Sequence, residues 1–210
     1  YDSPGVEKLA TLIGTPSNPG IFPRLLDTIF ETLKRNGLMY QDTLKNVSDA
    51  DKLRRGTEKF STNWNNRQKE NQFVVDDVNK DRTYSVFVSF IQVRNNFVYD
   101  MLDTSENKDK TMKLVSKDDY DFVFINGLKE VRVSSSEEAF ALLSKGFKLC
   151  EEECCRNLTG NKQCQYHRLF TIKLVQQPKF GSTLHRSVES VLTIVDVSSY
   201  TNQNIYGNCI

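Results

Sequence analysis

The sequence predicts an α/β fold, in which a central mixed, largely parallel β-sheet carries helices on both faces. Helix-like and strand-like apolar patterns alternate along the 210 residues. The segment 84–93 is apolar on both of its sides, as expected for a central strand that other layers cover on both faces. The length is enough for one domain with a substantial core, or for part of a larger domain.

The two predicted helices carry their own start and stop signals. The segment 18–37 reads as a turn and then a helix, with an apolar stripe at helical spacing and with Gly37 placed to end it. The stripe consists of Leu25, Leu26, Ile29, Phe30 and Leu33. The segment 134–150 reads as a second helix, with Ser135 and Glu138 available as a capping box.

The other regular segments read mostly as strands. Directly after the first strand, residues 95–102 are expected to form a short helix. Residues 112–135 indicate two or three short strands, with a turn at Asn126 and Gly127. Further strands are expected at 168–178 and 187–199.

Residues 40–72 stand apart as a polar segment. Their last part, STNWNNRQKENQ at 61–72, is nearly devoid of core-forming side chains. We therefore expect a partly disordered surface insertion at about 40–72. Its basic residues lack interleaved aromatic side chains, which favours a solvated face over a binding patch.

The composition excludes several classes of protein. The formal net charge of +1 gives no basic field for nucleic acid or for an anionic membrane. No segment reaches the roughly 20 apolar residues of a membrane span, and no secretory signal opens the chain. The first residue is Tyr1 rather than a methionine, so we expect a fragment. The odd number of cysteines, five, favours a reducing, cytoplasmic compartment over a disulfide framework.

Five segments together indicate a family. They are GTPSNPGIFPRLLDTIF at 14–30, VFVSFIQVRNNFVYDML at 86–102, EVRVSSSEEAFALLSKG at 130–146, HRLFTIKLVQ at 167–176 and LTIVDVSS at 192–199. In this order they resemble the motor domain of a kinesin, most closely the mitotic kinesin-like proteins of the central-spindle branch, where a polar insertion after the first helix also occurs. The resemblance implies that residues 1–210 are a partial motor domain with a P-loop NTPase fold, running from the phosphate loop to switch II and incomplete at both ends.

The resemblance places a degenerate phosphate loop at the start of the chain, over the kinesin pattern Y-G-x-T-x-x-G-K-T-x-T-x-x-G. Gly5 and Lys8 are kept as candidate phosphate ligands. Asp2 and Glu7 replace glycines, and each new charge costs roughly 4 kcal/mol against a phosphate charge about 4 Å away. Leu9 replaces the threonine whose hydroxyl would bind Mg²⁺.

The switch I pattern of the family, N-x-x-S-S-R-S-H, lies over residues 160–167. Only His167 is kept. The serines that would position Mg²⁺ and water fall on Gln163, Cys164 and Tyr166. The arginine of the pattern falls on Gln165. Switch I has therefore lost its reaction residues.

The switch II pattern, D-L-A-G-S-E, lies over residues 196–201. Asp196 remains, as the candidate second-shell ligand of Mg²⁺. Ser199 replaces the glycine that would sense the γ-phosphate, and Thr201 replaces the glutamate. That glutamate would pair with the switch I arginine, so both partners of one ion pair are lost.

A metal site is the alternative interpretation of the cysteine-rich segment. The soft ligands Cys150, Cys154, Cys164 and His167, with Cys155 beside the second, could hold zinc. Their spacing fits no common zinc motif. Reduced cysteines in a relaxed switch I loop would explain the same residues.

Three functions stay open. One is an ATP-driven microtubule motor, with Mg²⁺ and Lys8 holding the phosphates. Another is a motor-like module that no longer hydrolyses ATP and binds tubulin or a spindle partner. The third is the metal or redox module. Because reaction residues are lost from every nucleotide motif while the apolar strand patterns are intact, we expect weak or absent hydrolysis, expect poor binding of ATP and Mg²⁺, and name no catalytic residue.

The resemblance also implies partners and a location. It points to microtubules, the cytoskeleton, the mitotic spindle and cytokinesis, with a coiled-coil dimer as an option for the full-length protein. The strand pair near 113–126 corresponds to a minor microtubule contact in the family. Here it carries Asp118, Asp119 and Asp121, which oppose the acidic tubulin surface. We therefore expect this chain alone to bind microtubules poorly.

Overall fold

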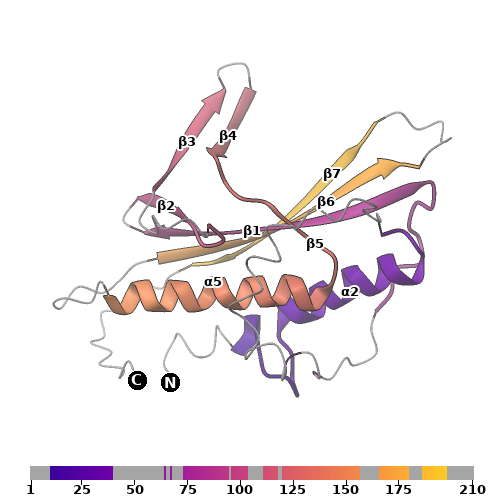
Figure 1. Ribbon diagram of the computed structural model, residues 1–210, viewed down its shortest axis with the longest axis horizontal. Coiled ribbons are helices and arrows are strands. Elements are labelled where there is room, and N and C mark those ends of the chain that lie inside the picture. Colours follow the sequence, from indigo (N-terminus) through magenta and orange to yellow (C-terminus); the bar gives the residue numbers. More distant parts are fainter. Residues whose placement is uncertain are drawn as a thin grey trace.

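The computed structural model joins helices and strands in a layered α/β arrangement (Figure 1). It describes residues 10–39, 64, 67, 73–94, 96–103, 111–117, 120–156, 166–179 and 186–197, without the side chains of 115–123 and 151–156. Its helices are α2 (Ile21–Arg35) and α5 (Ser136–Arg156). Its strands are β1 (Arg82–Arg94), β2 (Phe97–Asp100), β3 (Thr111–Lys117), β4 (Tyr120–Asn126), β5 (Val131–Val133), β6 (Tyr166–Pro178) and β7 (Val188–Asp196).

The strands form one sheet in the order β4-β3-β2-β1-β6-β7, with β5 beside β1. Every pairing between these strands is antiparallel. The prediction of a largely parallel sheet is therefore wrong for the described strands. The helical crossover that suggested it does exist, because α5 connects β5 to β6, which run in the same direction. However, β1 lies between those two strands and is antiparallel to both.

The expected short helix at 95–102 is replaced by β2. Arg94 of β1 is the register partner of Phe97, so the connection is a two-residue hairpin turn. Asn96 has a φ of 64°, in the left-handed region that such turns require and that asparagine tolerates. The apolar pattern of this segment therefore serves a strand rather than a helix.

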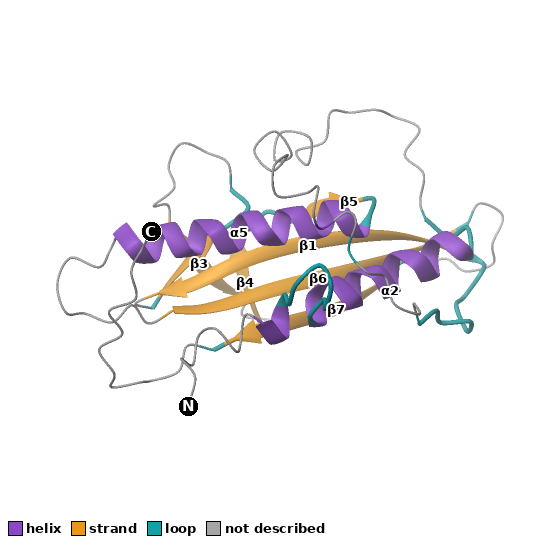
Figure 2. Ribbon diagram, turned by 90° about the horizontal axis from the view of Figure 1, so that it is seen from below, coloured by secondary structure: helices purple, strands orange, loops and turns teal. Residues whose placement is uncertain are grey.

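Both helices lie on the same face of the sheet (Figure 2). The prediction of helices on both faces is thus wrong for the described part of the chain. Strand β1 is nevertheless buried on both sides, since Ser85 and Ser89, which face away from the helices, are only 6% and 5% exposed. On that side the ammonium of Lys173 lies 5.8 Å from the centre of the Phe87 ring. The two-sided burial was predicted correctly, but helices supply only one side of it.

The predicted Gly37 ending and the Ser135 half of the predicted capping box are confirmed. Gly37 has a φ of +63° and donates its N–H to the Lys34 carbonyl, while Leu38 donates to Leu33, which together form a Schellman ending for α2. At the start of α5, Ser135 Oγ accepts the Glu138 N–H at 3.1 Å. The Glu138 carboxylate accepts from the N–H and the hydroxyl of Ser134.

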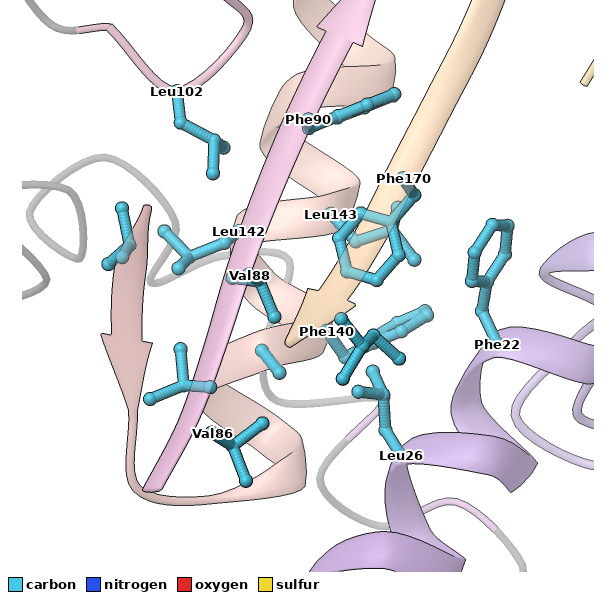
Figure 3. Close-up of a cluster of buried hydrophobic side chains, with 14 of the residues drawn as sticks. Phe22, Leu26, Val86, Val88, Phe90, Leu102, Phe140, Leu142, Leu143 and Phe170 are labelled. Atoms are coloured by element: carbon cyan, nitrogen blue, oxygen red, sulfur yellow. The ribbon is translucent and has the colours of Figure 1, made fainter. Parts of the chain in front are cut away.

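The core lies between the two helices and the helix-facing side of β1 and β6 (Figure 3). The ring centroid of Phe90 lies 5.2 Å from that of Phe147 and 6.0 Å from that of Phe170. Phe22 reaches from α2 to within 5.2 Å of Phe170. At Gly146, α5 approaches so closely that an added Cβ would lie 2.0 Å from Phe90 Cδ1. The absent side chain therefore sets the distance between α5 and β1.

The insertion at 40–72 is not purely a surface segment. The structure describes two of its residues, Trp64 and Arg67, and their exposed fractions are 8% and 4%. The expectation of a surface segment does not hold at these two positions. The tryptophan joins the main apolar cluster, and the rest of the insertion lies outside the described residues.

Asp100 ends β2 and holds two other segments. Its Oδ1 accepts the Leu102 N–H at 2.8 Å and its Oδ2 accepts the Lys129 N–H at 2.9 Å. Burial raises the pKa of this carboxyl above its ordinary value of 3.8, and Asp103 adds to the rise, while the two hydrogen bonds and the Lys129 charge oppose it.

Gly146→Ala should lower stability although alanine favours helices. The helix propensity gain is about 1 kcal/mol, whereas forcing a methyl group against the buried Phe90 ring costs about 1–3 kcal/mol. We expect a net loss of about 1 kcal/mol in urea unfolding. Lys148→Ala, at an exposed position of the same helix, is the control and should change stability by less than about 0.5 kcal/mol. A more stable Gly146→Ala variant would contradict the close packing.

Asp100 should make stability depend on pH in a defined direction. Because its pKa is higher in the folded than in the unfolded chain, its contribution is full below pH 3.8 and is lost as the pH rises through the folded-state pKa. Asp100→Asn lacks this titration. We therefore expect the free energy of unfolding of the wild type, minus that of the variant, to fall between acidic and neutral pH in urea titrations. A difference that is constant or increases with pH would refute this.

Candidate functional site

The structure places only some of the predicted site residues. Residues 1–9, with the altered phosphate loop, lie outside the described residues, and so do Ser199 and Cys164. His167, Asp196 and Cys150 are described with their side chains. Their positions decide how much of a nucleotide or metal site can be assembled from the described part.

A row of polar side chains crosses the sheet where β7 ends and β6 begins. Gln92 of β1 is the register partner of Arg168 of β6, which in turn is the partner of Asp196 of β7. Two positions earlier on β1, the partners are Phe90 and Phe170, which face the helices. Because side chains alternate between faces, the polar row lies on the helix face as well.

Arg168 binds the Asp196 carboxylate within this row. Its Nε donates to Asp196 Oδ2 at 2.9 Å, and its Nη2 lies 2.7 Å from the same oxygen. The two side chains are only 12% and 10% exposed. The guanidinium also lies over aromatic rings, 4.6 Å from the Phe147 centroid and 5.1 Å from that of Tyr166. Arg168 thus connects β6 to β7 and to α5 at once.

His167 lies on the opposite side of the sheet from Asp196. It is the second residue of β6 and pairs with Val93. Since Arg168 faces the helices, the preceding residue points to the other face. The kept residues of switch I and switch II are therefore not brought together by the described strands.

The zinc alternative gains no support from the described side chains. Cys150 is fully buried in the apolar cluster on the helix face of the sheet, whereas His167 is on the other face. Cys154 lies within α5, but its side chain is not described. No group of three or more candidate ligands gathers in the part of the chain that the structure describes. With Cys164 outside that part, the zinc site stays a hypothesis.

The residues around Asp196 do not fit a bound Mg²⁺. A magnesium site needs free carboxylate or water oxygens, but Asp196 Oδ2 already accepts the Nε–H of Arg168 and lies 2.7 Å from its Nη2. A divalent cation about 4 Å from the guanidinium would be repelled by roughly 8 kcal/mol at an effective dielectric near 20. On the other side of Arg168, Gln92 is 1% exposed and its Nε2 has no hydrogen-bond partner, so the polar row offers no second carboxylate for a metal.

Arg168 is the residue that sequence reasoning missed. The family pattern for switch I ends at His167, one position earlier, and gave no reason to consider it. A signal was present, since a basic residue opens one apolar strand and an acidic residue closes the next. In an antiparallel pair of consecutive strands these two ends lie side by side.

Comparison with known proteins decides the family. Residues 4–207 match the model described as "Kinesin motor domain". The chain belongs to this family. The resemblance noted from the five segments is thereby confirmed, and the relatives below agree with the mitotic kinesin-like proteins that it indicated.

The similar curated proteins are kinesin-like proteins that are much longer than this chain. "Kinesin-like protein KIF23" of Mus musculus is 28% identical over 97% of the chain and 25% of its own length. "Kinesin-like protein subito" of Drosophila melanogaster is 29% identical over 89% of the chain and 33% of its own length. "Kinesin-like protein KIF20B" of Homo sapiens is 25% identical over 80% of the chain, which is 11% of that protein. The chain therefore spans a third or less of each.

Solved structures confirm the fold. A chain described as "kinesin 6" has a TM-score of 0.61 and 24% identity, covering 93% of this chain and 56% of that one. The structure titled "Structure of a fast kinesin: Implications for ATPase mechanism and interactions with microtubules" has a TM-score of 0.60 and 18% identity, covering 100% of this chain and 46% of that one.

Among the described residues, no helix is long and apolar enough to span a membrane.

The pair formed by Arg168 and Asp196 should carry a large coupling energy. Arg168→Met or Asp196→Asn alone leaves a mostly buried charge or donor unpaired, and we expect each to cost about 3 kcal/mol of unfolding free energy. The double variant should lose less than the sum, by about 1–3 kcal/mol, in a urea-unfolding cycle.

The matched control is the exposed pair of Arg35 and Glu31 on α2, whose Nε and Oε1 lie 2.8 Å apart. Its coupling should be about 0.3–0.5 kcal/mol. If the coupling of Arg168 with Asp196 were equally small, this ion pair would not hold β6 and β7 together.

Proposed function

We propose that this chain is a degenerate microtubule-motor domain in which ATP hydrolysis is weak or lost, and which acts by binding rather than by moving. Its partner in this role is tubulin or another spindle protein. Membership of the kinesin motor domain family supports the motor-type architecture. The loss of hydrolysis is supported by the sequence of the phosphate loop and both switches.

The observation that carries the proposal is the occupied carboxylate of Asp196. In the family's reaction this aspartate would act on Mg²⁺, but here its Oδ2 is held by Arg168 at 2.7 and 2.9 Å. When bound, Mg²⁺ would neutralise phosphate charge in phosphoryl transfer. The altered loop, with Asp2, Glu7 and Leu9, removes support for the same ion. Changes in separate segments of the chain thus all weaken the binding of the same Mg²⁺ ion.

An ATP-driven motor is the second candidate. Its support is the family match over residues 4–207 and the presence of Gly5 and Lys8 in the loop. Lys8 could still hold phosphate oxygens as a point charge. In that case the motor would bind ATP with weak metal dependence and turn over slowly.

The cellular setting belongs to the proposal as well. Its basis is the likeness to the mitotic kinesin-like proteins. It suggests a cytoplasmic, microtubule-associated protein of the spindle that acts in cytokinesis, with a coiled coil for dimerisation in the longer protein.

Calorimetric titration with ATP, with and without Mg²⁺, tests the proposal. We expect no metal-dependent binding in the micromolar range, because two acidic residues and a leucine replace the groups that hold the phosphates and the metal. Lys8→Ala should then change nothing measurable. Metal-dependent micromolar binding that Lys8→Ala abolishes, together with microtubule-stimulated phosphate release, would establish the live motor instead.

The control is the motor domain of one of the curated relatives, measured under the same conditions. It tests whether the assay detects metal-dependent nucleotide binding. A microtubule pelleting assay with both proteins separates the binding role from the chemistry. We expect this chain alone to pellet weakly and without any effect of ATP, in which case its binding role falls to another spindle protein rather than to tubulin.

A further inference from the structure

Two side chains of the insertion, Trp64 and Arg67, lie inside the helical layer. Their exposed fractions are 8% and 4%, although the surrounding sequence is strongly polar. A polar segment that only covers the surface has no need to bury an arginine, because desolvating a charge is costly unless it is paired. The contacts of these two residues show which interactions offset the cost of desolvation.

Arg67 connects three separate segments through its guanidinium. Its Nε donates to Asp27 Oδ2 of α2 at 2.9 Å, and its Nη2 forms an ion pair with the other oxygen of the same carboxylate. The same Nη2 donates to Ser136 Oγ at 3.0 Å and lies 3.7 Å from Glu137 Oε1, both in the first turn of α5. Its Nη1 donates to the Trp64 carbonyl at 2.8 Å.

Only an arginine can make this set of contacts. The bidentate pairing with Asp27 needs the planar fork of a guanidinium, and the remaining donors still reach α5 and the insertion itself. A lysine would keep the charge but has no fork. The residue is therefore a geometric link between two helices and not merely a neutralising charge.

Trp64 adds an apolar contact next to this link. Its ring centroid lies 4.5 Å from that of Phe140, one turn further along α5 than Ser136, with the planes inclined by 49°. Where the insertion returns to the sheet, the Val75 N–H donates to Thr32 Oγ1 of α2 at 3.2 Å. The insertion is thus fixed to both α2 and α5 in its interior, and the residues that follow it are fixed to α2.

We propose that Trp64 and Arg67 are an anchor through which the insertion sets the position of α2 relative to α5. In this role the insertion is a built-in conformational device. α2 follows the residues that match the phosphate loop, and α5 ends shortly before those that match switch I. Release of the anchor would loosen both helices together. Asp27 would then lose the charge that compensates its carboxylate.

The single tryptophan of the chain makes the anchor directly observable. In a urea titration of the wild type, Trp64 emission and far-UV circular dichroism should change together, because the anchor belongs to the same cooperative unit as the helices. With Arg67→Lys, the emission should already be shifted to longer wavelength without urea. In this variant the Trp64 emission should change at a lower urea concentration than the far-UV circular dichroism signal of the helices.

Amide hydrogen exchange tests the coupling of the helices. Arg67→Lys should speed exchange by about 10-fold or more in the first turn of α5 and around Asp27 of α2. Exchange in the β6–β7 pairing should stay unchanged. Arg35→Lys on α2, which alters an exposed arginine, is the matched control and should leave both the emission and the exchange as in the wild type.

Quenching of Trp64 by acrylamide in the unmutated chain needs no variant to fold. Quenching as strong in the native chain as in urea would overturn the proposal. So would an Arg67→Lys variant with wild-type emission and exchange. If Arg67→Lys unfolds the chain, Asp27→Asn provides the milder change, since its amide keeps one acceptor for the guanidinium. It should give the same early shift of Trp64 emission, and an unshifted emission would count against the anchor.

Discussion

The close approach of α5 to β1 at Gly146 determines where the other described elements lie. Because no side chain separates the helix from the sheet there, Phe90 can pack between Phe147 and Phe170. The ring of Phe22 then completes the cluster from α2. This cluster of aromatic rings therefore holds two helices and two strands together. In a close-packed interior a shift of one of these rings is transmitted to its neighbours. The polar contacts at the edges of this core depend on that spacing.

Two arginines border the aromatic core along α5, Arg67 buried and Arg168 mostly buried. Arg67 binds at the first turn of the helix, and Arg168 lies over Phe147, about three turns later. Each guanidinium is held by one aspartate, Asp27 or Asp196, and each joins segments that are distant in the sequence. Such pairs add geometric specificity more than net stability, since desolvation offsets much of their attraction. They fix which segments meet around α5, whereas the apolar core supplies the free energy.

Local signals in the sequence predicted the elements well, and their arrangement less well. The Gly37 ending and the Ser135 cap were predictable because each depends on residues within one helical turn. The apolar pattern of β1 showed that both of its faces are buried, but it carried no information on what covers them or on the direction of the neighbouring strands. Trp64 and Arg67 were misjudged because their partners are distant in the sequence. Asp27 lies 40 residues before Arg67, and Phe140, the partner of Trp64, lies on α5. Arg168 was missed because the family pattern stops just before it.

The presence of Asp196 is not in itself a sign of retained chemistry. If the carboxylate were kept to act on a metal, its oxygens would face a space with room for a hydrated cation and other acceptors. Here its Oδ2 accepts from Arg168, and the pair is mostly buried on the helix face of the sheet. A carboxylate in that position has a structural role, since its removal would leave a mostly buried guanidinium unpaired. The residue that best matches the switch II pattern thus has a structural explanation, which supports the proposal that this kinesin-type domain has replaced a metal-dependent contact with a permanent ion pair.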